Sequence, residues 1–138
     1  MKRVFFDANV LFTAAHNPGG KAALVIELGT QGRLHLLTSD YAIAEARHNL
    51  ALKFPASLAA FDGLLHHFEA VNPALPNPCP IELPGKDQPI FVAAMTGNAT
   101  HLLTGDLRDF GRHMNKPRRT LGIVVQTVAD FLNQPDLR

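Results

Sequence analysis

Two aspartates far apart in the sequence each come shortly after a short apolar run. The run 3–6 ends at Asp7, and Asn9 follows two positions later. The run 101–103 leads through two further residues to Asp106. In an open parallel sheet, ligand sites lie just beyond the carboxyl ends of the strands. We therefore expect these two acids to meet at one edge of a sheet.

Glu45 and Asp87 are two further acids that can join this meeting point, one on an expected helix and one at a helix start. Several carboxylates that converge without a cation repel each other, and a divalent ion removes that repulsion. A site made only of carboxylates suits Mg²⁺ or Mn²⁺ rather than zinc. Such ions bind phosphates and activate water. If the four acids converge, the predicted chemistry is phosphodiester cleavage.

Each acid also has an ordinary structural interpretation. An aspartate before a helix commonly caps it by accepting backbone N–H bonds, and this applies to Asp7, Asp87 and Asp106. Glu45 alone is typical of a solvated helix surface. The combination of four such positions among the 12 acids of the chain favours the functional interpretation.

Short apolar runs alternate with helical patterns along the chain, which predicts an α/β fold with a parallel sheet covered by helices on both faces. Prolines in the segment 70–86 predict an edge strand, an extended connection or a loop there. Strands are expected at 3–6, 34–37, 100–103 and 121–125. Helices are expected at 8–15, 20–30, 40–53 and 56–69, from Asp87 onward and after Thr127.

The composition indicates one domain spanning residues 1–138 in the cytoplasm. The apolar fraction is 46% and the net charge is +1, so charge excludes no class of partner. Cys79 is the only cysteine, which excludes an internal disulfide and favours a reducing compartment. Asp7 and Asn9 interrupt the N-terminal apolar run, which argues against a signal peptide. Without an apolar stretch of ~20 residues, no membrane span is expected.

Four blocks of the sequence resemble, in order and spacing, the four blocks of the PIN domain family. The blocks are Val4 to Leu11, Tyr41 to Arg47, Asp87 to Ile90 and Leu102 to Phe110. The resemblance implies a three-layer α/β/α fold with a central parallel sheet in the order 3-2-1-4-5. It also implies a Mg²⁺- or Mn²⁺-dependent nuclease that acts mostly on RNA.

Small bacterial members of the family, of about this size, are typically the toxins of type II toxin–antitoxin systems, the VapC-type group. The resemblance therefore implies a small antitoxin protein as a partner, with a tail that covers the acidic pocket. Homodimers are common in the group, so a second copy of the chain is another candidate partner.

The resemblance assigns the acidic metal-binding set to Asp7, Glu45, Asp87 and Asp106. Asp7 and Asp106 are the implied direct ligands, and the other two acids bind directly or through water. Asp109 matches a position that is less regularly acidic and is expected to support the ligands. Asn9 and Thr104 match polar positions that orient carboxylates or a water by hydrogen bonds. A helix-cap partner and a turn hydroxyl are the alternative roles of these two residues.

Lys86 departs from the family pattern, because an additional acid is common at the position before the third block. The proline-rich run before that block is a second departure. These two departures put the occupancy of a second metal ion in question, but not that of the first.

A basic cluster follows the fourth acid, and it offers candidate contacts to RNA. Such a run is usually a solvated loop, but beside an acidic metal site it can hold the phosphate backbone. The residues are Arg108, Arg112, Lys116, Arg118 and Arg119.

Two other functions fit parts of the sequence. A phosphatase of the haloacid-dehalogenase type also begins with a strand-terminal aspartate, but it needs a second Asp where Asn9 stands, and it has no place for Glu45. A PIN-like module that binds RNA or protein without cleavage is the non-enzymatic alternative.

Overall fold

The structure is a computed structural model that describes residues 1–73 and 78–135. Its five strands form one parallel sheet in the order β3-β2-β1-β4-β5. The strands are β1 (Arg3–Phe6), β2 (His35–Thr38), β3 (Phe68–Ala70), β4 (His101–Leu103) and β5 (Val124–Gln126). This sheet order and its parallel direction confirm the α/β fold expected from the sequence.

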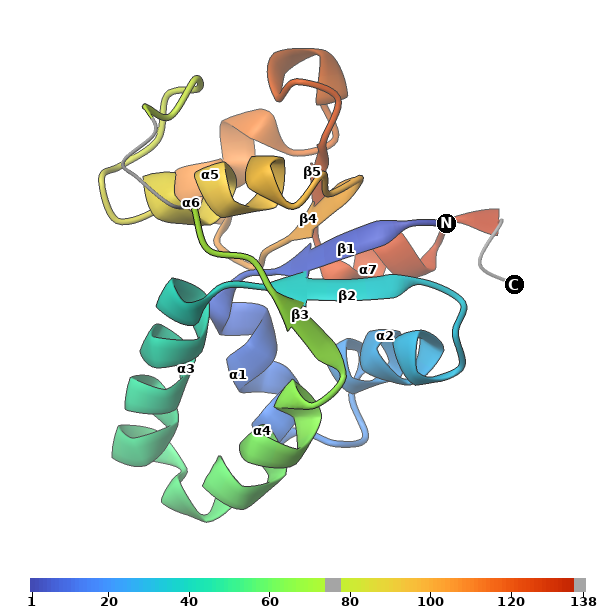
Figure 1. The fold of residues 1–138 in the computed structure, drawn as a ribbon, viewed down its shortest axis with the longest axis vertical. Coiled ribbons are helices and arrows are strands. Elements are labelled where there is room, and N and C mark those ends of the chain that lie inside the picture. The colour runs from blue at the N-terminus through green and yellow to red at the C-terminus, as the bar shows by residue number, and fades with distance from the viewer. Residues whose placement is uncertain (74–77, 136–138) are drawn as a thin grey trace.

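Helices cover both faces of the sheet, which gives three layers (Figure 1). Helices α1, α2 and α4 lie on one side, and α5 and α6 lie on the other. Helix α2 also contacts α7. The helices are α1 (Ala8–His16), α2 (Lys21–Thr30), α3 (Asp40–Lys53), α4 (Leu58–Leu65), α5 (Gln88–Thr96), α6 (Leu107–Phe110) and α7 (Val128–Leu132). Three 3-10 turns lie at Pro55–Ser57, Gly111–His113 and Pro117–Arg119.

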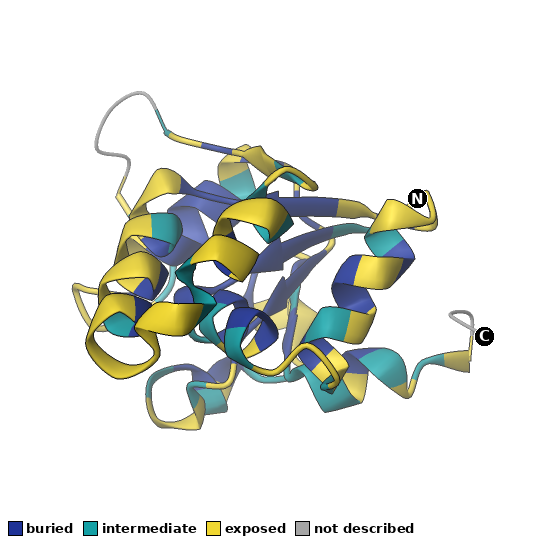
Figure 2. Cartoon of the chain, turned by 90° about the horizontal axis from the view of Figure 1, so that it is seen from below, coloured by how far each residue is buried: buried dark blue, intermediate teal, exposed yellow. Residues whose placement is uncertain are grey.

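The central strand β1 explains why the strands read as continuous apolar runs. Val4, Phe5 and Phe6 are all 0% exposed, so both faces of the strand are covered. Figure 2 shows the same pattern across the sheet, with buried strands inside and exposed outer helix faces. Burying such a side chain stabilises the fold by about 1.5–3 kcal/mol. In β1 the polar residues therefore flank these three, with Arg3 at the start of the strand and Asp7 just past its end.

The helix predicted over 56–69 is wrong in its last four residues. Helix α4 ends at Leu65, and Phe68 begins the edge strand β3 beside β2. The ring of Phe68 packs edge-on against Phe6, with ring centroids 5.0 Å apart. Burial against the sheet and pairing with β2 therefore override a helical apolar stripe. Of the proline-rich segment 70–86, residues 74–77 lie outside the described part.

The last strand begins later than predicted. Leu121 and Gly122 have φ angles of 57° and 89°, which is left-handed backbone and incompatible with a strand. They form a turn, and β5 begins at Val124.

The crossover connections place the candidate site beside β1. The chain passes from β1 to β2 through α1 and α2, and returns to β4 through α5 on the opposite face of the sheet (Figure 1). Where the direction of winding reverses, the carboxyl ends of neighbouring strands border a crevice. Within the described ranges, no helix combines the length and the apolar character that a membrane crossing requires.

Candidate metal centre

Strand register places Asp7 beside Thr104. Phe6 pairs with Leu103, and the Asp7 N–H donates to the Leu103 carbonyl at 3.0 Å. Asp7 and Thr104, the next residues along the two segments, therefore lie side by side at the carboxyl edge of the sheet. The hydroxyl of Thr104 donates to Asp7 Oδ2 at 2.8 Å and accepts from the Asp106 N–H at 3.1 Å. One hydroxyl thus links both strand-end acids.

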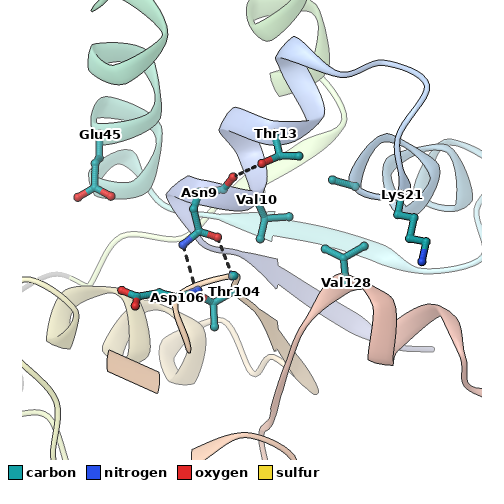
Figure 3. A pocket seen from close by; sticks show the side chains of 10 residues that line it. Asn9, Val10, Thr13, Lys21, Glu45, Thr104, Asp106 and Val128 are labelled. Carbon is teal, nitrogen blue, oxygen red and sulfur yellow. Dashed lines mark hydrogen bonds between the residues drawn. The ribbon is translucent and has the colours of Figure 1, made fainter. Parts of the chain in front are cut away.

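Asn9 ties the start of α1 to the loop after β4 (Figure 3). Its Nδ2 donates to Asp7 Oδ2 at 3.2 Å, and its Oδ1 accepts from the Gly105 N–H at 2.7 Å. Gly105 permits this approach, because a Cβ there would lie only 3.3 Å from Asn9 Oδ1. Asn9 and Thr104 therefore both hold the Asp7 carboxylate in place.

Asp7 also caps α1, so its structural and candidate functional roles coexist. Its Oδ1 accepts from the Ala8 N–H at 2.7 Å. Burial raises the pKa of Asp7, the Thr104 and Ala8 hydrogen bonds lower it, and the negative charges of Glu45 and Asp106 raise it further. Asp7 is 4% exposed. A buried carboxylate near two other acids fits a bound cation, which would relieve both the burial and the repulsion.

A cavity of about 750 Å³ opens beside these residues. Glu45 reaches toward it from α3, and Asp106 borders it from the loop between β4 and α6 (Figure 3). Lys21, at the start of α2, lies on the opposite side of the cavity from both acids. In the sequence Lys21 reads as part of a glycine turn, and no spacing links it to the acids. The cavity is lined by Asn9, Val10, Thr13, Lys21, Ala22, Glu45, Thr104, Gly105, Asp106 and Val128.

A second group of acids surrounds the ammonium of Lys86. Carboxylate oxygens of Asp87, Asp106 and Asp109 lie within 4.8 Å of one another. Lys86 Nζ lies 2.7 Å from Asp109 Oδ2, 3.3 Å from each Asp87 oxygen and 3.6 Å from Asp106 Oδ2. Asp106 is therefore common to this group and to the cavity. The structure places Asp109, expected only as a support, directly among the acids.

Asp87 differs from the other two helix-start aspartates, because its side chain forms no cap bond on α5. Its carboxylate faces Lys86 instead. Burial and the hydrogen bond with Asp109 raise the pKa of Asp87 to about 6, and Lys86 opposes this rise. The bond from Lys86 lowers the pKa of Asp109. The same bond raises the pKa of Lys86, which therefore stays an ammonium at neutral pH.

Tyr41 connects the acids of the two groups. Burial is the largest cause that raises the pKa of its phenol, and the charges of Glu45, Asp87 and Asp7 raise it further. Its hydroxyl donates to the Lys86 carbonyl at 2.8 Å. Asp106 lines the cavity with Glu45, is linked to Asp7 through the Thr104 hydroxyl, and has a carboxylate oxygen within 4.8 Å of one of Asp87, so all four acids predicted from the sequence lie around one edge of the sheet.

The predicted basic residues divide into two sets. Arg108 and Arg112 border a smaller cavity of about 360 Å³ together with Asp109, and Arg112 pairs with Glu82 at 3.2 Å. The other three residues belong to the described part of the chain but line neither this cavity nor the larger one; they are Lys116, Arg118 and Arg119.

A family model described as PIN domain matches residues 3–108. The chain belongs to the PIN domain family. The matched span contains all four acids of the predicted set. No curated protein matches the chain.

Two solved structures share the fold of this PIN domain. One is VapBC2 from Rickettsia felis bound to a DNA fragment from their promoter, at 15% identity and a TM-score of 0.63. The alignment covers 91% of this chain and 98% of that one. The other is VapBC-1 from nontypeable Haemophilus influenzae, at 16% identity and a TM-score of 0.57, covering 92% and 98%. Both likenesses extend over nearly the whole chain, so the family fold accounts for most of its length.

Proposed function

We propose that this chain is a metal-dependent endoribonuclease, formed by a single PIN domain over residues 1–138. The observation that carries the proposal is the Asp7 carboxylate, which is buried and fixed by Asn9 and Thr104 while Glu45 and Asp106 add repulsion. Such an arrangement costs free energy in the absence of a cation. Its position beside an open cavity, at the switch point of a parallel sheet, supports a catalytic role.

Mg²⁺ or Mn²⁺ is the proposed cofactor, because the donor set is made of carboxylate oxygens. Asp7 and Asp106 would hold the ion, and Glu45 and Asp87 would bind it directly or through water. When bound, such an ion activates water and stabilises the leaving oxygen of a phosphodiester. Asn9 and Thr104 keep the Asp7 oxygens oriented, and Asp109 supports Asp106 through the Asp109 N–H at 3.1 Å from Asp106 Oδ1. Hydrolysis would leave 5′-phosphate and 3′-hydroxyl ends.

Basic residues around the acids would hold the RNA backbone. Lys21 faces Glu45 and Asp106 across the larger cavity and would contact a phosphate there. Arg108 and Arg112 would continue this contact past Asp109. Phosphate contacts of this kind position RNA without reading its sequence. Lys116, Arg118 and Arg119 are the more distant candidates.

We further propose that the protein is the toxin of a type II toxin–antitoxin system in the cytoplasm. The shared fold with two VapBC structures and the family membership support this role. A small antitoxin protein is the proposed partner, and a homodimer is a second proposed assembly. Growth arrest on expression, abolished by Asp7→Asn and rescued by a neighbouring small gene, is the expected cellular result.

The decisive experiment measures cleavage of a mixed RNA pool in Mn²⁺ or Mg²⁺. We expect the wild type to cleave, a chelator to stop cleavage, and Asp7→Asn to lose at least about 100-fold in rate, because a ligand to the ion is removed. Asp62→Asn is the matched control, since Asp62 pairs with Arg47 on the surface and should leave cleavage unchanged.

The other outcomes separate the alternatives. Cleavage that survives both the chelator and Asp7→Asn would overturn the proposal. RNA binding without turnover in any divalent metal would favour a non-catalytic PIN module. A haloacid-dehalogenase-type phosphatase is disfavoured by the family match and by Asn9, whose amide donates to Asp7 where that chemistry needs an acid.

A further inference from the structure

Lys86 brings a positive charge into the acidic site itself. An ammonium has three N–H donors and no acceptor. Here three carboxylates surround it, at 2.7 Å from Asp109, 3.3 Å from Asp87 and 3.6 Å from Asp106. This is more than a single surface ion pair, because the three acids come from two separate chain segments.

One hydrogen bond holds the Lys86 carbonyl and others close the adjoining turn, so the approach of Lys86 to the acids is built into the fold. Tyr41 of α3 donates to the Lys86 carbonyl at 2.8 Å. Two hydrogen bonds close the neighbouring turn. The Asp87 N–H donates to the Pro84 carbonyl at 2.9 Å, and the Gln88 side-chain amide donates to the Leu83 carbonyl at 3.0 Å. The lysine stem therefore starts from a fixed point beside Asp87.

The contrast with Asp7 identifies what this lysine does. Asp7 is held by neutral donors from Asn9, Thr104 and Ala8, which orient its carboxylate but leave its negative charge in place. Between Asp87, Asp106 and Asp109 the ammonium itself supplies positive charge. A divalent ion would need the same carboxylate oxygens, and repulsion from an ammonium a few ångströms away opposes its binding.

We propose that Lys86 is a built-in cation that takes the place of a second divalent ion between Asp87, Asp106 and Asp109. The chain therefore binds one divalent ion, on the side of Asp7 and Glu45, and Asp87 contributes to that ion only through water. Lys86 is a positioning residue in this scheme, because it acts through the acids and not on the RNA. The inference rests on the proposed metal-dependent function and specifies its stoichiometry.

The test is a Mn²⁺ titration of the full chain, read by the electron paramagnetic resonance signal of free Mn²⁺ and by calorimetry, without RNA. We expect one ion per chain for the wild type and for Lys86→Arg, which keeps the charge. Lys86→Gln should bind two ions, the second at least about tenfold more tightly than any further binding to the wild type. Lys53→Gln, at the end of α3 beside Phe12, is the matched control and should bind one.

Two ions in the wild type, or one ion in Lys86→Gln, would overturn the inference. Neither result bears on the proposed nuclease activity, which is tested separately by RNA cleavage with the wild type and with Asp7→Asn. A melting curve in chelator identifies unfolding: Lys86→Gln should melt cooperatively, and Mn²⁺ should raise its melting temperature more than that of the wild type. Equal shifts in the two proteins would count against the inference.

Discussion

The two halves of the acidic site handle negative charge in opposite ways. In the buried half, Asp7 lies 4% exposed among the neutral donors of Asn9 and Thr104. The outer half is named for Lys86, whose side chain is 62% exposed and whose ammonium Asp87 and Asp109 share, although Asp87 itself is only 6% exposed. Asp106 contacts both halves, through Thr104 on one side and Lys86 on the other.

This difference shows how a folded chain can tolerate a cluster of carboxylates and still leave some of them able to attract a cation. Hydrogen bonds from neutral groups fix the direction of a carboxylate but do not cancel its charge, so the buried half still attracts a cation. An ammonium cancels charge directly and competes with a metal for the same oxygens. The fold thus separates orientation from neutralisation within a single site.

The largest effect that distinguishes the halves is expected from Thr104→Val. This change removes the donor to Asp7 Oδ2 and the acceptor for the Asp106 N–H. Loss of a residue that orients ligands typically weakens metal affinity by about 10–100-fold. Mn²⁺ calorimetry should show a loss in that range.

Thr38→Val is the matched control for this prediction. Thr38 is also buried at the end of a strand, but its hydroxyl donates to the Phe6 carbonyl at 3.0 Å and not to an acid. Its loss should lower the free energy of unfolding by about 1 kcal/mol while Mn²⁺ affinity stays the same. Equal losses of metal affinity in both variants would mean that Thr104 acts only through stability.

A smaller effect, on the outer half, is expected from pH. The folded pKa of Asp87 is raised from 3.8 to about 6, so between these values the folded chain holds a proton that the unfolded chain has released. The stability of the metal-free protein should therefore fall as pH rises from about 4 to about 6, by on the order of 2 kcal/mol. The lowered pKa of Asp109 acts in the opposite direction, at pH values below its ordinary one.

Urea denaturation in chelator measures this pH dependence. Asp87→Asn should make the fall in stability between pH 4 and 6 less steep, because one titrating group is gone, while Asp7, whose pKa is also raised by burial, still contributes. Asp130→Asn, on α7 outside both acid groups, should leave it unchanged. A wild-type curve that rises steadily through this range would contradict the assigned direction.

The smallest expected effects concern RNA contact at the rim. Lys21→Ala, made in the Asp7→Asn background to prevent cleavage, should weaken RNA affinity by several-fold and reduce the salt slope by about 0.7 for one lost phosphate contact. Lys116→Ala should change affinity less, because Lys116 lies outside the lining of both cavities. Filter binding at several salt concentrations gives both quantities. A larger effect at Lys116 would move the RNA path toward the turn 117–119.

The strand-end acids were the predictable part of this site. Apolar runs that stop at Asp7 and shortly before Asp106 are local patterns, and parallel strands bring their carboxyl ends to one edge. Membership of the family then accounts for the sheet order. The start of β3 at Phe68 was not predictable in this way, because its neighbours on β1 and β2 are remote in sequence.

By itself, the sequence determined which residues carry charge, where the strands before Asp7 and Asp106 end, and which acids can converge. Only the tertiary structure decided which groups pair with these charges or face them. Lys86 lies beside Asp87 in the sequence, but its bond to Asp109 depends on the α5 and α6 segments meeting across the sheet edge. Lys21 faces Glu45 across a cavity because the tertiary fold brings α2 and α3 to its two sides. Side-chain direction and long-range packing set these distances, and neither is encoded in local spacing.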